Sequence, residues 1–187
     1  DNLLVIDRSH YRIRHINPKS GKVNTVAGNG LKLFAGDGGP ATGATLSFPH
    51  GMVVDKDDNL IFSDKGHYRI RKITPEGIIN TIGGNGSRGN VGNNIPALEA
   101  NFYNVTTLIQ NSTGDTFMLS PSGFVSLIRR LDKKGVIHDY LETADENYLE
   151  AISKSKYKGL VQTGAVATIT QFSDIVFDPK GKLFISD

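Results

Sequence analysis

The chain has 187 residues, enough for one domain with a sizeable hydrophobic core. Its 21 Lys and Arg against 19 Asp and Glu give a net charge of +2, which provides neither an overall basic field for nucleic acid nor an acidic tail. The absence of cysteine excludes a disulfide scaffold, a thiolate metal site and a cysteine nucleophile. No apolar run approaches the roughly 20 residues of a membrane-spanning helix.

The sequence repeats itself from its first residues onward. NLLVIDRSHYRIRHIN at 2–17 returns as NLIFSDKGHYRIRKIT at 59–74, 57 positions later. NTVAGNG at 24–30 then returns as NTIGGNG at 80–86. Internal repeats of this length are typical of propellers and other repeat architectures.

Each copy contains four short apolar runs. In the second copy we expect strands at 51–55, 60–64, 68–74 and 78–83. The turn sequences Asp-Lys-Asp-Asp, Lys-Gly-His and Pro-Glu-Gly separate them. Four-stranded antiparallel units that recur along a chain are typical of propeller blades, so the predicted fold is an all-β propeller.

The amino-acid sequence of the second copy resembles a known repeat. AGDGGPATGATLSFPHGMVVDKDDNLIFSDKGHYRIRKITPEGIINTIGGNG at 35–86 resembles an NHL repeat, in its longer form with a Gly-Asp-Gly-Gly-Pro connector. The resemblance extends over 2–86, weakens over 105–137 and returns at 172–187. It implies a β-propeller, usually of six blades, and it admits both interaction scaffolds and RNA-binding proteins.

The two ends of the sequence carry the same predicted strand, because 182–187 aligns with 2–7. We therefore expect about three and a quarter blades of a longer protein, which as an isolated piece would expose open blade faces and not be a stable monomer. The expected organisation is a partial first blade at 1–30, a second at 48–86, a third at 102–140, an insertion at 141–170 and a partial fourth at 171–187.

A motif that combines an acid, an imidazole and a guanidinium occurs in the first two copies. Its members are Asp7, His10 and Arg12, and Asp64, His67 and Arg69. One interpretation is a catalytic or anion-binding cluster. The other is structural, with Asp64 accepting hydrogen bonds from Arg69 or from the His67 turn, because buried charges must be paired.

The third copy separates these two interpretations. There the acid is replaced by Ser120, the imidazole by Val125 and the arginine by Leu127, so that all three groups disappear together. Groups that are copied and lost as a set behave as structural partners, and a unit present in several blades is not a single active site. We predict a structural role and no catalytic residue.

Metal and phosphate sites are not expected. The five histidines form no His-x-x-x-His pair, and His50, which precedes an innermost strand, has Thr106 and Ser173 as its equivalents in other blades. Some propeller lyases and hydrolases bind a metal at the central channel, but Thr and Ser are poor ligands. The connector at 34–40 lacks the lysine of a phosphate loop and the alternating acids of a calcium loop, so we interpret it as a tight inter-blade turn. No cofactor is predicted.

Nucleic acid is not expected as a partner, because acids balance the basic residues of the strands and no aromatic residues interleave with them. Three sequons give a faint indication of secretion, as part of a larger extracellular protein. Their acceptors are Asn85, Asn104 and Asn111.

The repeat is interrupted between its third and fourth copies, where extra residues fall within 140–170. A capping box at Thr143–Glu146 and a stop at Gly159 predict a helix over 143–158. Because loops carry function more often than the scaffold, this insertion is a candidate partner-binding element. Its candidate residues are Tyr148, Leu149, Ile152, Lys154 and Lys156.

No catalytic group survives comparison between the copies. The sequence therefore favours a non-catalytic propeller that binds another protein, or a glycan, through its ring face or loops. A propeller enzyme of lyase or hydrolase type, with its site in the central channel, is the alternative. An RNA-binding NHL domain is the third hypothesis. The fold alone does not distinguish these three functions.

Overall fold

The computed structural model describes residues 3–122, 125–142 and 173–186, and this part of the chain folds into antiparallel strands joined by turns and short 3₁₀ helices. The strands of the first two sheets are β1 (Leu3–Asp7), β2 (Arg12–Ile16), β3 (Val23–Ala27), β4 (Pro49–Val54), β5 (Leu60–Asp64), β6 (Arg69–Ile73) and β7 (Ile79–Gly83). Those of the next two are β8 (Ile95–Pro96), β9 (Thr107–Gln110), β10 (Thr116–Ser122), β11 (Val125–Leu131), β12 (Val136–Glu142), β13 (Asp174–Phe177) and β14 (Leu183–Ser186). The 3₁₀ helices are η1 (Arg8–His10), η2 (Ala41–Gly43), η3 (Lys65–His67) and η4 (Ala97–Glu99).

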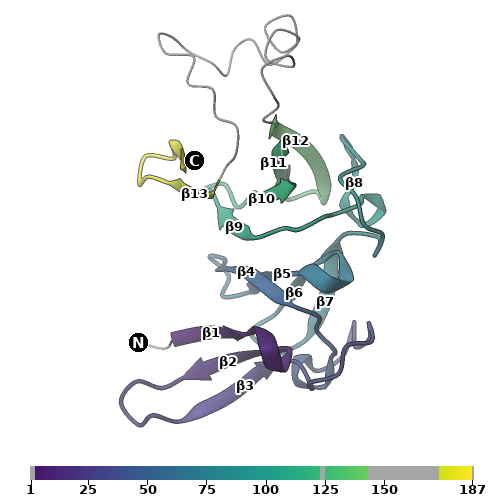
Figure 1. Ribbon diagram of the computed structural model, residues 1–187. Helices are drawn as coiled ribbons and strands as arrows, with labels where there is room; N and C mark the ends of the chain where they lie inside the picture. Colours follow the sequence, from purple (N-terminus) through teal and green to yellow (C-terminus); the bar gives the residue numbers. More distant parts are fainter. Residues whose placement is uncertain (1–2, 123–124, 143–172, 187) are drawn as a thin grey trace, which may run out of the picture.

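Four sheets follow one another along the chain. Their strand orders are β1-β2-β3, β4-β5-β6-β7, β8-β12-β11-β10-β9 and β13-β14. The first three lie one above the other, and β13 lies beside β9 (Figure 1). The inner strands β4, β9 and β13 are neighbours in this order, as they are around the axis of a propeller. This arrangement confirms the prediction of an all-β propeller.

The strands of the second sheet match the sequence prediction closely. The turn between β4 and β5 is fixed by Asp55, whose carboxylate accepts the backbone N–H groups of Asp57 and Asn59 at 2.9 and 2.8 Å. After η3, Tyr68 takes a left-handed conformation with φ of 54°, and β6 begins at the next residue. Local turn chemistry therefore sets the length of each strand.

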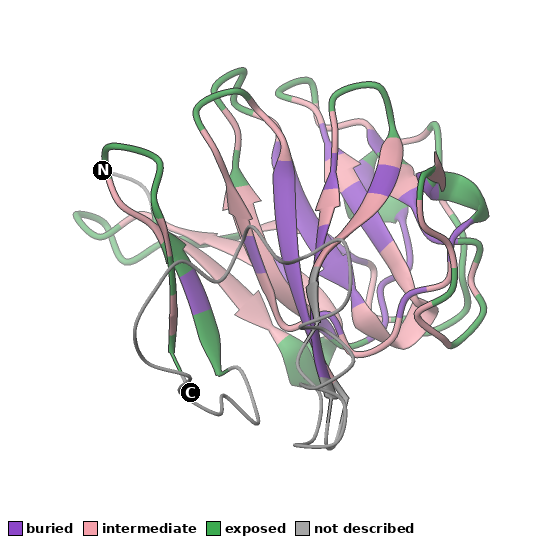
Figure 2. Ribbon diagram, turned by 90° about the horizontal axis from the view of Figure 1, so that it is seen from above, coloured by how far each residue is buried: buried purple, intermediate pink, exposed green. Residues whose placement is uncertain are grey.

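The hydrophobic core lies between the sheets, and strand alternation divides it. Phe62 packs toward the first sheet, with Leu46 and Ile13, whereas its neighbour Ile61 packs toward the third sheet, with Met118. A third cluster joins the third and fourth sheets around Phe117, Leu119, Ile128 and Ile175. Buried positions run along the strands, and the turns at their ends are exposed (Figure 2).

The connectors differ from the tight inter-blade turn predicted from sequence. The first one runs to the outer edge of the next sheet, where Gly38 N–H donates to the Ile79 carbonyl at 2.8 Å and Ile79 N–H donates to Gly39 at 3.0 Å. The second connector does the same as strand β8, which pairs with β12 and makes the third sheet five-stranded. An outer strand otherwise leaves its backbone groups unpaired, and the connector satisfies them.

The helix predicted over 143–158 falls outside the described residues. Within the described part of the chain, no helix has the length and hydropathy needed to cross a bilayer.

Candidate functional site

The Asp64 carboxylate is fully buried and has three hydrogen-bonding partners. It accepts the Ser47 N–H at 2.7 Å, lies 2.8 Å from His67 Nδ1 and accepts Arg71 Nη1 at 3.2 Å. Arg71, itself fully buried, also lies 2.8 Å from the Asp37 carboxylate of the connector. This network joins the connector, β5, η3 and β6 inside the second sheet.

Of the two partners expected as alternatives for the Asp64 carboxylate, the structure shows His67 and not Arg69. The Arg69 guanidinium donates to the carbonyls of His67 and Asn85, both at 3.1 Å. In the first sheet Arg12 likewise donates to the carbonyls of His10 and Asn29, at 3.1 and 2.9 Å. Through these hydrogen bonds, the first arginine of each motif links the 3₁₀ turn to the start of the following connector.

In the third sheet Leu127 replaces Arg69, as the sequence comparison indicated, but the second arginine of the motif is retained. Arg129 occupies the place of Arg71 and is fully buried, but its Nε donates to Asp139 on β12 at 3.0 Å. Its Nη1 donates to the Asn101 carbonyl at 2.9 Å. The carboxylate has thus moved from the second strand to the fourth, opposite the arginine. This is how a buried ion pair behaves, since its charge must keep a partner.

The copy of the motif in the first sheet has the same pairing and more exposure. Asp7 lies 2.7 Å from His10 Nδ1 and 3.2 Å from Arg14 Nε. The His10 side chain is 68% exposed, whereas that of His67 is 9% exposed. The difference arises because the connector covers His67, with Phe34 packed edge-on against the imidazole at 5.5 Å between ring centroids.

His67 is held between two acceptors. Its Nδ1 faces the Asp64 carboxylate, and its Nε2 lies 2.6 Å from the Lys32 carbonyl, so both nitrogens must carry a proton to satisfy both contacts. Burial alone would lower the pKa of His67 and so would the Arg71 charge, but the Asp64 hydrogen bond and charge, together with the Lys32 carbonyl, raise it above 6.5. The imidazolium therefore fastens the connector to the second sheet.

This geometry predicts a pH-dependent connector. When a histidine has a higher pKa in the folded than in the unfolded state, its protonation stabilises the folded state. This contribution is complete at pH values below the unfolded-state pKa, and it is lost as the pH rises through the folded-state pKa. Deprotonation then removes one of the two donors, worth about 1 kcal/mol for a hydrogen bond. Amide exchange of Ala35, whose N–H donates to Thr45 Oγ1 at 2.9 Å, should become about fivefold less protected at high pH in the full-length protein, after correction for intrinsic rates. His67→Gln should remove this pH dependence, and unchanged protection in the native protein would contradict the account.

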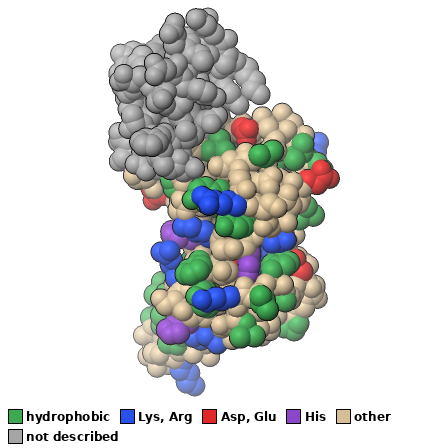
Figure 3. Space-filling view, turned by 45° about the vertical axis from the view of Figure 1, so that its right-hand side comes forward, with side chains coloured by type: hydrophobic (Ala, Val, Ile, Leu, Met, Phe, Trp, Pro, Cys, Tyr) green, Lys and Arg blue, Asp and Glu red, His purple; other side chains and the backbone are tan. Residues whose placement is uncertain are grey.

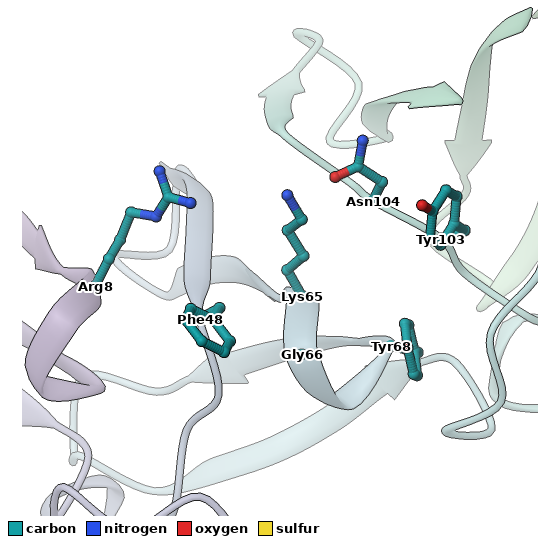
Figure 4. A pocket seen from close by; sticks show the side chains of 7 residues that line it. All are labelled: Arg8, Phe48, Lys65, Gly66, Tyr68, Tyr103 and Asn104. Atoms are coloured by element: carbon teal, nitrogen blue, oxygen red, sulfur yellow. The ribbon is translucent and has the colours of Figure 1, made fainter. Parts of the chain in front are cut away.

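A hollow of about 300 Å³ opens where the 3₁₀ turns meet the chain that enters the inner strands. It is lined by Arg8, Phe48, Lys65, Gly66, Tyr68, Tyr103 and Asn104. Arg8, Lys65 and Asn104 extend to the same side, and Phe48 lies between the two cations (Figure 4). Phe48 and Asn104 occupy equivalent places in the repeat and have left-handed backbones, with φ of 46° and 53°. The hollow is thus built by the repeat, with different side chains in each copy.

The electrostatics of this hollow favour a negatively charged ligand. None of its seven lining residues is acidic, and neither Arg8 nor Lys65 forms an ion pair with a described carboxylate. Burial and the nearby Arg8 charge lower the pKa of Lys65. Burial, followed by the charges of Arg8 and Lys65, lowers the pKa of His50 at the adjoining end of β4, against the effect of its hydrogen bond to the Thr106 carbonyl. The cations repel one another, and an anion would relieve this repulsion.

The hollow belongs to what we term the connector face, formed by segments 8–12, 28–50, 65–69 and 84–106. These segments carry six Lys and Arg against two carboxylates, and one of the two, Asp37, is paired with Arg71. The described turns of the opposite face carry seven of each sign; they are 17–22, 55–59, 74–78, 111–115, 132–136 and 178–182. Figure 3 turns the η1 and η3 side forward and shows Lys and Arg interspersed with hydrophobic side chains. Within the described residues, the connector face is therefore the more basic of the two faces.

Sequence reasoning missed this site. Arg8 and Lys65 are equivalent in the repeat, each one residue after the motif aspartate, so two neighbouring cations could have been inferred. The expected lack of interleaved aromatic residues holds along the strands but not in space, since Phe48, Tyr68 and Tyr103 come from three different segments.

Only some of the other predicted site residues lie within the described part of the chain. The side-chain amide N–H groups of Asn85 and Asn104 donate to the carbonyls of Glu99 and Pro121, at 3.1 and 2.6 Å. Asn111 lies in a turn of the opposite face and accepts the Asp115 N–H. The described residues contain no cluster of three His, Asp or Glu side chains able to hold a metal ion. The predicted insertion residues, from Tyr148 to Lys156, lie outside the described part of the chain.

No protein-family model matches this chain. Among solved structures, it is similar to a protein of unknown function from Bacteroides thetaiotaomicron, with 25% identity and a TM-score of 0.53 over 63% of this chain and 29% of that one. It is similar to a catalytically inactive virginiamycin B lyase from Staphylococcus aureus with quinupristin, with 16% identity and a TM-score of 0.54 over 99% and 44% of the two chains. A gluconolactonase from Xanthomonas campestris matches with 16% identity and a TM-score of 0.52 over 76% and 44%.

These similarities establish the propeller fold. The structural neighbours include a lyase, a lactonase and a protein of unknown function, so the fold is shared by enzymes and by proteins with no assigned activity. The chain spans less than half the length of each of these three proteins.

Proposed function

We propose that the chain is part of an NHL-type propeller that serves as a protein-binding scaffold and holds its partner on the connector face. The hollow between Arg8 and Lys65 is the observation that carries this proposal, because its lining offers cations, aromatic rings and an amide but no carboxylate or imidazole. The buried network around Asp64 supports the same conclusion, since a fully buried carboxylate that holds strands together does not reach a substrate. The predicted insertion over 143–158 remains a second proposed contact.

Photo-cross-linking from matched positions tests this function. A photoreactive phenylalanine analogue would replace Ser9, in η1 on the connector face, or Ser112, in a turn of the opposite face, in the full-length protein inside the cells that express it. Both serines are exposed. We expect protein adducts from position 9 and few from position 112. Adducts from position 112 alone, or none from either, would contradict the proposal.

His50 favours an enzyme as the second candidate function. Its Nδ1 lies 2.9 Å from the Thr106 carbonyl, so Nδ1 carries the proton and Nε2 is left as a potential base at the end of an inner strand. Turnover of lactones by the full-length protein, abolished by His50→Ala, would establish this alternative over the scaffold.

A further inference from the structure

The geometry points to an acidic peptide with apolar residues as the ligand of the connector face, its carboxylates lying between Arg8 and Lys65 and its apolar side chains on Leu31 and Leu33. This inference rests on the proposed function and gives the partner's chemistry. It is carried by the contacts that join the hollow to the first connector, and by how the charges of this face are paired.

The hollow continues into an apolar surface through direct contacts. Phe48 is 46% exposed and packs edge-to-face on Tyr11, with 5.3 Å between ring centroids. The Lys32 ammonium lies 4.9 Å from the centroid of the Tyr11 ring. On either side of Lys32, Leu31 is 64% exposed and Leu33 is 83% exposed. Cations and apolar side chains thus alternate from the connector to the hollow.

The second connector does not repeat this surface. The equivalent positions in the second connector are Ser87, Arg88, Gly89 and Asn90, where the repeat offers no apolar side chains. The blade fold therefore does not require leucines at 31 and 33. Their side chains stay in water, and burying them would contribute about 25 cal/mol of stabilisation per Å² of apolar area. Exposed apolar residues beside unpaired cations are typical of surfaces that bind proteins.

The carboxylates nearest the two cations along the chain are engaged elsewhere. Asp64 is buried with His67 and Arg71, and Asp7 is paired with His10 and Arg14. Of the two carboxylates of the connector face itself, Asp37 is paired with Arg71, and Glu99 does not line the hollow. Arg8 and Lys65, in contrast, have no carboxylate partner among the described residues. An anionic ligand would supply the charge that complements them.

Two aromatic rings of the connector face, Phe34 and Tyr103, favour a peptide over single-stranded nucleic acid. Stacking platforms for bases need free ring faces. The Arg69 guanidinium carbon lies 3.8 Å from the Phe34 centroid, and that of Arg88 lies 4.3 Å from the Tyr103 centroid. These rings hold the protein's own cations, whereas Leu31 and Leu33 suit apolar side chains.

Fluorescence anisotropy with labelled probes tests the inference on the full-length protein. The probe is a short peptide of alternating Glu and Leu, compared with the same peptide carrying Gln in place of Glu and with a U-rich RNA oligonucleotide. We expect the Glu–Leu peptide to bind best and to weaken as salt shortens the Debye length from about 10 Å at 0.1 M to about 3 Å at 1 M. Arg8→Gln with Lys65→Gln should weaken binding about tenfold, and Lys133→Gln with Lys134→Gln on the opposite face should leave it unchanged.

A charge-reversal variant separates recognition from loss of folding. Arg8→Glu with Lys65→Glu should lose the Glu–Leu peptide and gain a Lys–Leu peptide, which an unfolded protein would not do. Equal peptide binding by native protein and the double Gln variant would overturn the inference, and so would tighter binding of the RNA. If the peptide fails while position 9 still cross-links a protein, the peptide chemistry is wrong and the scaffold function stands. If both fail, the proposed function fails as well.

Discussion

Asp64→Asn should lower the free energy of unfolding of the full-length protein by about 3 to 5 kcal/mol, because it removes the fully buried carboxylate partner of Arg71 and leaves only the partly exposed Asp37 to pair with this buried charge. The substituted amide would turn an N–H₂ group toward His67 Nδ1 and Arg71 Nη1, which are both donors. Arg71 is fully buried and has no access to water in compensation. Urea denaturation followed by circular dichroism measures the loss.

Asp37→Asn is the matched control, since Asp37 pairs with the same arginine. Its side chain is 37% exposed, whereas that of Asp64 is fully buried. Solvent-exposed ion pairs contribute about 1 kcal/mol or less, so we expect the control to lose no more than this. Equal losses for the two variants would show that burial of the pair does not determine its importance.

Gly84→Ala should be the second strongly destabilising change. Gly84 lies where β7 leaves the second sheet, with φ of +91°. A Cβ there would overlap the Tyr68 carbonyl oxygen and come within 2.9 Å of Phe102, in the core shared with the third sheet. The left-handed backbone costs about 1 to 2 kcal/mol for a residue with a Cβ, and the overlap adds about 1 to 3 kcal/mol.

Gly77→Ala measures the free-energy cost of the left-handed backbone without the packing overlap. Gly77 has φ of +81°, and a Cβ there would meet nothing within 4 Å. This variant should therefore lose only the first 1 to 2 kcal/mol or so. Thermal unfolding of both full-length variants checks the comparison, and a loss at position 77 as large as that at position 84 would contradict the packing argument.

The blade strands could be predicted from sequence because local chemistry sets them. Leu60–Asp64 was placed without error, since the Asp55 turn and η3 limit β5 on both sides. Strand β8 could not be found in this way. It has two residues, and it is a strand only because the connector reaches the outer edge of β12.

The buried ion pairs were less accessible to sequence reasoning. Asp64 lies directly opposite Arg69 in the strand register, so Arg69 was the natural partner to expect. Asp64 pairs with Arg71 instead, because the Arg69 guanidinium donates to the Asn85 carbonyl. The hollow was less accessible still, because Arg8, Phe48, Lys65 and Tyr103 meet only when two sheets and two connectors are assembled.

The location of a bound ligand tests the central claim most directly, namely that the connector face is the recognition surface. Hydrogen–deuterium exchange of the full-length protein, with and without the Glu–Leu peptide, measures it. We expect added protection at residues 8–12, 31–35, 65–69 and 103–106, and unchanged exchange in the turns of the opposite face, such as 55–59 and 132–136. Protection confined to those opposite turns would contradict the account.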